Sequence, residues 1–165
     1  MNASETEWVF AYGSNMNLGD LRGWLAAQGH SGDGIRRVEL AILPGYRLVW
    51  NYRSITRDGG AANVAPCAGR NLPRLALSVD ARTLATIDRK EGHPRYYSRA
   101  SAPIVVRLQR GEDISAWVYI AVPERCSAAP VPPRRAYLDL LLKAAREHAL
   151  PAWYVAELEA TTTAD

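Results

Sequence analysis

The sequence has few of the residues from which metal sites and disulfide frameworks are built. Its two cysteines, Cys67 and Cys126, lack the paired spacing of a metal site, and one pair does not form a disulfide scaffold. The three histidines, His30, His93 and His148, show no metal-ligand spacing. We therefore expect neither a metal nor a cofactor.

Long runs of one kind of residue are also absent. The net charge is +3 and the pI is near 9.0, yet no Lys/Arg run has the length of a nucleic-acid patch, so we read the basic residues as solvated faces. No apolar run reaches the ~20 residues that cross a bilayer. The polar, acidic residues 1–7 predict no signal peptide. These absences argue against nucleic-acid and membrane partners and favour a cytoplasmic protein with reduced thiols.

What is present is a mixture of short apolar strands and helices. The 165 residues, 48% of them hydrophobic, suffice for a single domain, 1–165, with its own core. Aromatic, β-branched or alternating segments predict strands at 8–12, 38–42, 46–50, 61–65, 75–79, 104–108 and 114–122. Helical spacing predicts helices between Asn17 and Gly29, over 81–91, through the leucines before Pro151, and over 153–158. The pattern indicates an α+β fold in which a small, mixed, barrel-like sheet is flanked by a few helices.

Prolines and glycines mark the expected breaks between these elements. Pro44-Gly45 predicts a turn between two strands, and Pro66 predicts the end of a strand. The proline-rich stretch 123–133 is interpreted as a connection within the domain, because an apolar helix follows at once. Residues 161–165 are expected to form a frayed tail.

The first candidate site is the segment Tyr12-Gly13-Ser14-Asn15, which follows the first predicted strand. Gly13, Ser14 and Asn15 tolerate tight or left-handed backbone, and Asn17 is a suitable N-cap for the next helix. A strand, a glycine turn and a helix start together direct several N–H groups to one place, where they can hold an anion. The alternative is a plain turn, because one glycine is a weak signal.

The second candidate is Glu91, at the end of the helix predicted over 81–91. Leu84, Ile87 and Glu91 are spaced i, i+3 and i+7, which places the carboxylate on the apolar face of the helix, while Lys90 points elsewhere. Burial raises the pKa of a carboxyl group toward neutrality, as general acid/base catalysis requires. Periodicity alone favours a buried salt bridge over catalysis, and Asp88 shares roughly the same face.

Taken together, these segments resemble the γ-glutamylcyclotransferase family. The resemblance rests mainly on Phe10-Ala11-Tyr12-Gly13-Ser14-Asn15-Met16, Asp88-Arg89-Lys90-Glu91-Gly92, Tyr96-Tyr97 and Pro132-Pro133-Arg134-Arg135-Ala136-Tyr137-Leu138. It implies a small mixed barrel flanked by helices and an enzyme of the lyase or acyltransferase type. Such an enzyme converts a γ-glutamyl amino acid or amine to 5-oxoproline and the free amine. It further implies Glu91 as the catalytic acid/base, with Tyr12, Gly13, Ser14, Asn15, Tyr97 and Tyr137 as substrate-binding residues and no metal or cofactor.

Several alternatives stay open at this stage. Glutathione-directed relatives more often carry Leu where this chain has Asn15, and relatives acting on γ-glutamyl-lysine-type amides usually have Gly-Thr-Leu in the turn. A non-catalytic module that binds a small molecule with the same fold is the third alternative, against which the retained Glu91 argues. The sequence leaves open the exact γ-glutamyl substrate, whether the turn holds a carboxylate or an oxyanion, and the oligomeric state, with a homodimer as one option.

Overall fold

The computed structural model describes residues 5–165, so the first four residues of the polar start lie outside the described part. The strands are β1 (Thr6–Ala11), β2 (Ile35–Ser54), β3 (Gly59–Asp80), β4 (Tyr97–Ser98), β5 (Ile104–Leu108), β6 (Asp113–Trp117) and β7 (Ile120–Ala121). The helices are α1 (Leu18–Ala27), α2 (Ala81–Glu91), α3 (Arg135–Glu147) and α4 (Ala152–Glu159), with 3-10 turns η1 (Ser14–Met16) and η2 (Pro123–Arg125).

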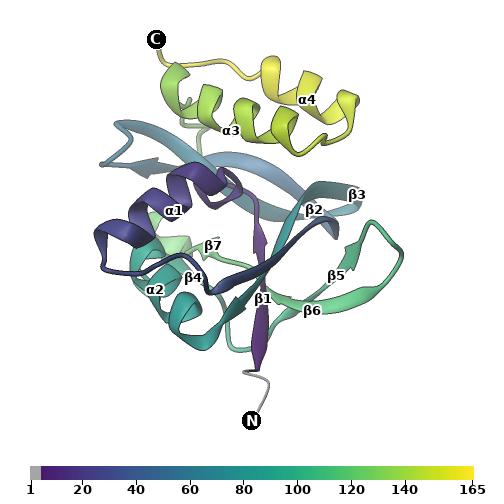
Figure 1. Ribbon diagram of the computed structural model, residues 1–165. Helices are drawn as coiled ribbons and strands as arrows, with labels where there is room; N and C mark the ends of the chain where they lie inside the picture. The colour runs from purple at the N-terminus through teal and green to yellow at the C-terminus, as the bar shows by residue number, and fades with distance from the viewer. Residues whose placement is uncertain (1–4) are drawn as a thin grey trace.

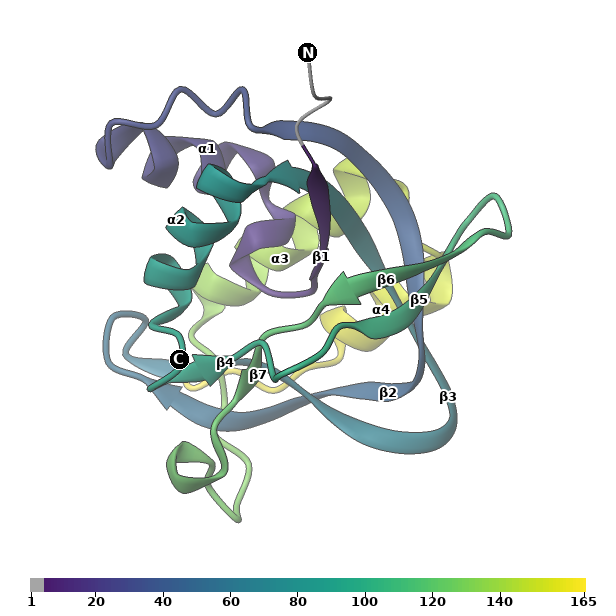
Figure 2. The same ribbon diagram turned by 90° about the horizontal axis from the view of Figure 1, so that it is seen from below.

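Five strands form a closed barrel in the order β1-β3-β2-β5-β6. β1 is antiparallel to β3 along its whole length and closes the barrel by running parallel to β6 at Trp8 and Val9. Figures 1 and 2 show α1 and α2 together on one side of this barrel, while α3 and α4 lie side by side across one end. The prediction of an α+β fold with a mixed, barrel-like sheet and flanking helices is confirmed.

The long ribbon formed by β2 and β3 corrects two of the predicted breaks. Pro44-Gly45 does not turn the chain back, because β2 continues through it with a register shift between Pro44 and Tyr46 and with Gly45 at a φ of +74°. Pro66 does not end its strand, because β3 runs on while Pro66 pairs with Tyr46. Such irregularities bend a strand without ending it, which lets the ribbon wrap around the barrel.

The strand predicted over 114–122 is divided into two in the structure. Its first part is β6, in the barrel, and its last part is β7, which leaves the barrel and pairs with β4 through Tyr97 and Ala121. This change of partner brings Tyr97 beneath the end of the long ribbon, where its ring lies 4.9 Å from that of Tyr52.

α1 and α2 each begin at a residue whose side chain caps the helix. The Asn17 side chain accepts a hydrogen bond from Asp20 N (3.1 Å) at the start of α1, and Asp80 accepts one from Thr83 N (2.8 Å) at the start of α2. α2 ends at Gly92, whose φ of +65° is the left-handed conformation that favours glycine. The last predicted helix is present as α4, despite its irregular spacing.

The core fills the barrel and extends beneath the helices. Its fully buried residues include Val9 and Phe10 of β1, Leu75 and Leu77 of β3, Ile87 of α2, and Leu138 and Leu141 of α3. None of the helices within residues 5–165 has the length and apolar character needed to cross a membrane.

The segment expected to be a frayed tail contacts the start of α3. Ala164 N donates a hydrogen bond to the Pro133 carbonyl (2.9 Å), and Arg135 N donates one to the Asp165 side chain (2.8 Å). Residues 161–165 contain neither helix nor strand, yet they are fastened to α3.

Candidate active site

A cavity of about 750 Å³ opens where β1, the end of α2, the tip of the β2–β3 ribbon and the start of α3 meet. All the predicted site residues are among those that line it: Tyr12, Gly13, Ser14, Asn15, Glu91, Tyr97 and Tyr137. They come from four separate segments of the chain. The fold therefore brings together two motifs that lie far apart in the sequence.

The turn after β1 forms one wall of this cavity. Met16 N and Asn17 N donate to the carbonyls of Gly13 and Ser14, each at 3.0 Å, and these bonds close the 3-10 turn. The first N–H groups of such a turn have no partner inside it, so those of Gly13, Ser14 and Asn15 are available to a ligand.

Gly13 does not adopt the left-handed backbone, one of the two conformations that the sequence suggested it could tolerate, because its φ is −108°. A Cβ atom at this position would lie 3.3 Å from the Tyr137 hydroxyl and 3.7 Å from the Ala62 Cβ. The glycine therefore permits a close approach between the turn, β3 and α3.

Glu91 is the last residue of α2, and its carboxylate faces the turn. Asn15 Nδ2 donates a hydrogen bond of 2.8 Å to Glu91 Oε1. Within residues 5–165 no Lys, Arg or His nitrogen lies within 4 Å of the Glu91 carboxylate, so the salt bridge considered as the alternative does not form. The pKa of Glu91 is raised above its ordinary value, because burial outweighs the opposing effects of Lys90, Asn15 and Arg57.

Asp88, the other acid considered on this helix face, is held in hydrogen bonds to neighbouring side chains. Its carboxylate accepts hydrogen bonds from Arg99 Nε (2.8 Å) and from the Tyr119 hydroxyl (2.7 Å), and it does not line the cavity. Glu91 is thus the acid of α2 that faces the cavity.

The tyrosine hydroxyls of the cavity have distinct hydrogen-bonding capacities. The Tyr97 hydroxyl donates its proton to the Ala62 carbonyl (2.8 Å), so only its oxygen lone pairs are left for a ligand. The Tyr137 hydroxyl accepts from Ala62 N (3.4 Å), so its proton is left to donate. Burial raises the pKa of Tyr137 to about 12 and holds that of Tyr97 well above its ordinary value, which keeps both hydroxyls protonated. The Tyr12 hydroxyl donates to the Tyr119 carbonyl.

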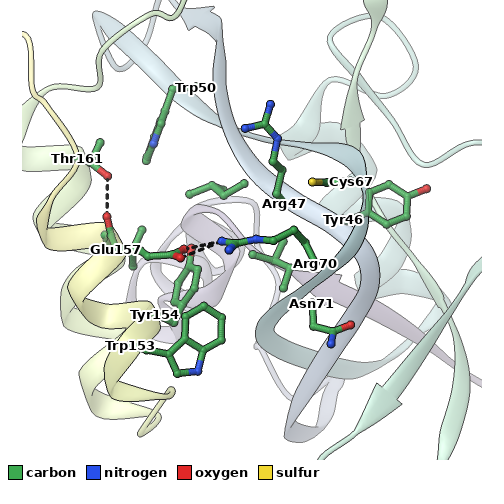
Figure 3. Close-up of a pocket in the computed structure, with 13 residues that line it drawn as sticks. Tyr46, Arg47, Trp50, Cys67, Arg70, Asn71, Trp153, Tyr154, Glu157 and Thr161 are labelled. Atoms are coloured by element: carbon green, nitrogen blue, oxygen red, sulfur yellow. Dashed lines mark hydrogen bonds and ion pairs between the residues drawn. The ribbon is translucent and has the colours of Figure 1, made fainter.

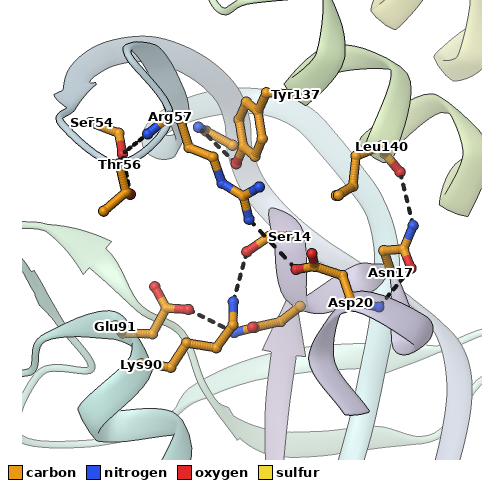
Figure 4. A network of polar contacts seen from close by, with 12 residues as sticks. Ser14, Asn17, Asp20, Ser54, Thr56, Arg57, Lys90, Glu91, Tyr137 and Leu140 are labelled. Atoms are coloured by element: carbon orange, nitrogen blue, oxygen red, sulfur yellow. Dashed lines mark hydrogen bonds and ion pairs between the residues drawn. The ribbon is translucent and has the colours of Figure 1, made fainter. Parts of the chain in front are cut away.

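Two cationic residues that line the cavity were not among the predicted site residues. Lys90 Nζ donates a hydrogen bond of 2.9 Å to Ser14 Oγ, and no carboxylate within the described chain lies within 4 Å of it (Figure 4). Burial lowers its pKa, and the charge of Glu91 opposes that effect. Helical periodicity predicted that Lys90 and Glu91 point in different directions. In the structure both side chains reach the cavity, because they stand in the last turn of α2.

Arg57, at the tip of the β2–β3 ribbon, is the second of these cations. Its Nη2 lies 3.5 Å from Asp20 Oδ2, and its guanidinium carbon lies 5.2 Å from the centre of the Tyr137 ring. Figure 4 shows it on the opposite side of the cavity from Lys90 and Glu91. It lies in the short turn that joins β2 to β3. Across residues 5–165, no three His, Cys, Asp or Glu side chains are grouped so that they could hold a metal ion.

A known protein shares a short stretch of sequence with this chain. The protein of Methanocaldococcus jannaschii named "Putative gamma-glutamylcyclotransferase MJ1514" is 48% identical over 48 residues, which are 29% of this chain and 38% of that protein. The match therefore spans less than half of that relative.

Solved structures share the fold. A structure entitled "Gamma-glutamyl cyclotransferase" superimposes with a TM-score of 0.79 at 21% identity, covering 98% of this chain and 90% of the other. A yeast structure described as a cyclotransferase specific to glutathione has a TM-score of 0.59 at 13% identity and covers 93% of each chain.

The family match covers most of the chain and includes both halves of the site. Residues 9–138 match the family described as gamma-glutamyl cyclotransferase, AIG2-like. This range contains the turn after β1, the end of α2, Tyr97 and Tyr137. The chain therefore belongs to the gamma-glutamyl cyclotransferase, AIG2-like family.

Proposed function

We propose that this protein is a cyclotransferase that converts a γ-glutamyl amino acid or γ-glutamyl amine to 5-oxoproline and the free amine. Glu91 acts as the general acid/base, and Tyr12–Asn15, Tyr97 and Tyr137 bind the substrate. The observation that carries this proposal is the Glu91 carboxylate in a large cavity, hydrogen bonded to Asn15 and without an ion-pair partner among residues 5–165. A module that only bound its ligand would gain nothing from a desolvated acid.

The reaction begins with a proton transfer. The α-amine of a γ-glutamyl compound is mostly protonated at neutral pH and is not nucleophilic in that form. The Glu91 carboxylate takes a proton from it, and the raised pKa of Glu91 brings the acid closer to that of the amine.

Ring closure follows within the same molecule. The freed nitrogen attacks the γ-carbonyl carbon, and a five-membered lactam forms as the bond to the leaving amine breaks. Glu91 returns its proton to that amine, and the second proton, which the attacking nitrogen loses when the lactam forms, also leaves with the amine as an ammonium group. The Glu91 carboxylate is thereby restored at the end of the cycle. Because the nucleophile and the carbonyl belong to one molecule, binding the folded conformer removes much of the entropic barrier.

The polar groups of the cavity favour one orientation of the substrate. Donors cluster at the turn, where the N–H groups of Gly13–Asn15, the Tyr137 hydroxyl and the Lys90 ammonium suit a carboxylate. The acceptors are the Glu91 carboxylate and the Tyr97 oxygen, and they suit the amine. In this proposal the turn holds the α-carboxylate, because Lys90 supplies a fixed positive charge beside it.

The experiment is a screen of γ-glutamyl amino acids, γ-glutamyl amines and glutathione, with the release of 5-oxoproline as the readout. We expect turnover of at least one compound and a loss of about 10²–10⁴-fold in kcat for Glu91→Gln, the usual contribution of general acid/base catalysis. Asp88→Asn is the matched control on the same helix, with turnover retained and a stability loss of roughly 1–2 kcal/mol. Parent-like turnover by Glu91→Gln would refute the role of Glu91, and no turnover of any compound would favour the binding module.

A further inference from the structure

Arg74 of β3 is an unusual residue for the interior of a barrel. Its side chain is 0% exposed, and it is the largest fully buried side chain among the described residues. No Asp or Glu oxygen of residues 5–165 lies within 4 Å of its guanidinium nitrogens. Burying a charge without a counter-ion costs free energy of desolvation. An arginine at this position therefore requires specific contacts that offset this cost.

The contacts of Arg74 join two distant parts of the chain. Its Nε donates a hydrogen bond of 3.2 Å to the Tyr12 carbonyl, and its Nη1 donates one of 2.8 Å to the Pro73 carbonyl next to it. Its guanidinium carbon lies 3.9 Å from the centre of the Tyr154 ring of α4, a cation–π distance. Arg74 Nη2 has no hydrogen-bond partner among the described residues. The guanidinium thus lies between α4 and the first residue of the turn that lines the cavity.

The Tyr12 carbonyl belongs to the same peptide group as the Gly13 N–H. Because a trans peptide is planar, its C=O and N–H point in opposite directions, so fixing the Tyr12 oxygen also fixes the direction of the Gly13 N–H. A cation bonded to the oxygen also polarises the peptide, which makes that N–H a stronger donor. Burial lowers the pKa of Arg74 to about 9, so the guanidinium remains charged at neutral pH.

We propose that Arg74, held in place by the Tyr154 ring, is a positioning residue that orients the Tyr12–Gly13 peptide for substrate binding. This inference rests on the proposed function, because it assigns the turn to the substrate. Arg74 does not line the cavity and does not touch the substrate. Its effect is exerted through the backbone of the turn.

The chain offers a matched control on the same strand. Arg70 of β3 also contacts α4, through an ion pair of 2.8 Å with Glu157, but it is exposed and has no contact with the turn (Figure 3). Substitution of Arg70 therefore removes an arginine that joins β3 to α4 while leaving the turn alone.

The test compares Arg74→Met with Arg70→Met in three measurements. We expect Arg74→Met to raise KM for the γ-glutamyl substrate by about tenfold or more with a smaller change in kcat, and to keep or raise the thermal midpoint. We also expect the Gly13 amide signal to move in the NMR spectrum. Arg70→Met should leave KM and the Gly13 signal unchanged. An unchanged KM together with an unmoved Gly13 amide in Arg74→Met would overturn the proposal.

Two further outcomes of this experiment lead to different conclusions. If the parent protein releases 5-oxoproline from none of the γ-glutamyl compounds, the proposed function fails, and the Gly13 amide alone decides the role of Arg74. If Arg74→Met does not fold, Arg74→Lys takes its place, because it keeps the charge and loses the planar fork. A raised KM and a moved Gly13 signal in Arg74→Lys support the proposal, and parent-like values of both reject it.

Discussion

The Asn15 amide donates a hydrogen bond of 2.8 Å to the Glu91 carboxylate, across 76 residues of sequence. This bond stabilises the charged form of the acid and so lowers its pKa, against the larger effect of burial that raises it. Together with the charges of Lys90 and Arg57, Asn15 therefore limits how far the pKa of Glu91 rises.

The first prediction concerns the pH dependence of Asn15→Leu. Removal of the hydrogen bond should raise the pKa of Glu91 further, so the carboxylate form that takes the proton is lost at a higher pH than in the parent. The acidic limb of the profile of kcat/KM against pH should move to higher pH. Asn71→Leu, a control on β3 outside the cavity, should leave the limb in place. A limb that moves to lower pH in Asn15→Leu would contradict this account.

The second prediction concerns Lys90, whose ammonium lies beside Ser14 without a carboxylate partner in the described chain. Lys90→Met should raise KM roughly tenfold, the equivalent of about 1.4 kcal/mol, because the substrate carboxylate loses its nearest cation. Lys143→Met, on the exposed face of α3, should leave KM unchanged. Steady-state kinetics at low salt, where charge effects are least screened, measures the difference. Equal KM values for parent and Lys90→Met would remove Lys90 from the binding site.

The third prediction concerns the close approach at Gly13. Its substitution by alanine places a methyl group 3.3 Å from the Tyr137 hydroxyl, so one of the two segments must shift. We expect Gly13→Ala to weaken substrate binding by roughly 1–3 kcal/mol, the usual effect of overpacking. Calorimetry in the Glu91→Gln background measures this without turnover. Gly23→Ala on α1, where a Cβ atom would meet nothing within 4 Å, is the control.

The fourth prediction separates the two tyrosine hydroxyls. Tyr137→Phe removes a free proton donor near Gly13, so it should weaken the binding of a carboxylate by about 0.5–1.5 kcal/mol, or roughly two- to tenfold in KM. Tyr97→Phe removes an acceptor and leaves the Ala62 carbonyl without its partner, so it should also lower the thermal midpoint. The two variants are compared by kinetics and by thermal unfolding. A Tyr137→Phe variant with parent-like KM would show that this hydroxyl does not reach the substrate.

Local sequence signals predicted the parts of the site that local structure determines. The N-cap at Asp80, the spacing of Leu84, Ile87 and Glu91, and the stop at Gly92 together define α2 and the face on which Glu91 stands. The turn at Gly13 was equally visible, although its reason is the approach of Tyr137 and not the sign of φ.

The other parts depend on partners that are distant in the sequence. Pro44 and Pro66 look like strand ends, but the pairing of β2 with β3 carries both strands past them. Arg57 enters the site because the ribbon tip folds over the cavity, and Arg74 is buried because α4 covers it with Tyr154. No periodicity within β3 distinguishes Arg74 from the exposed Arg70.

The pairing of β1 with strands on both of its edges has a consequence for amide hydrogen exchange. Val9 lies opposite Leu77 of β3 on one edge and Trp117 of β6 on the other, so its amide exchanges only when the barrel itself opens. The ribbon tip at Ile55, whose side chain is 89% exposed, has no such neighbours and exchanges through local opening. The strand that anchors the turn therefore opens only with the barrel, whereas the ribbon tip, which lines the same cavity, opens independently of it.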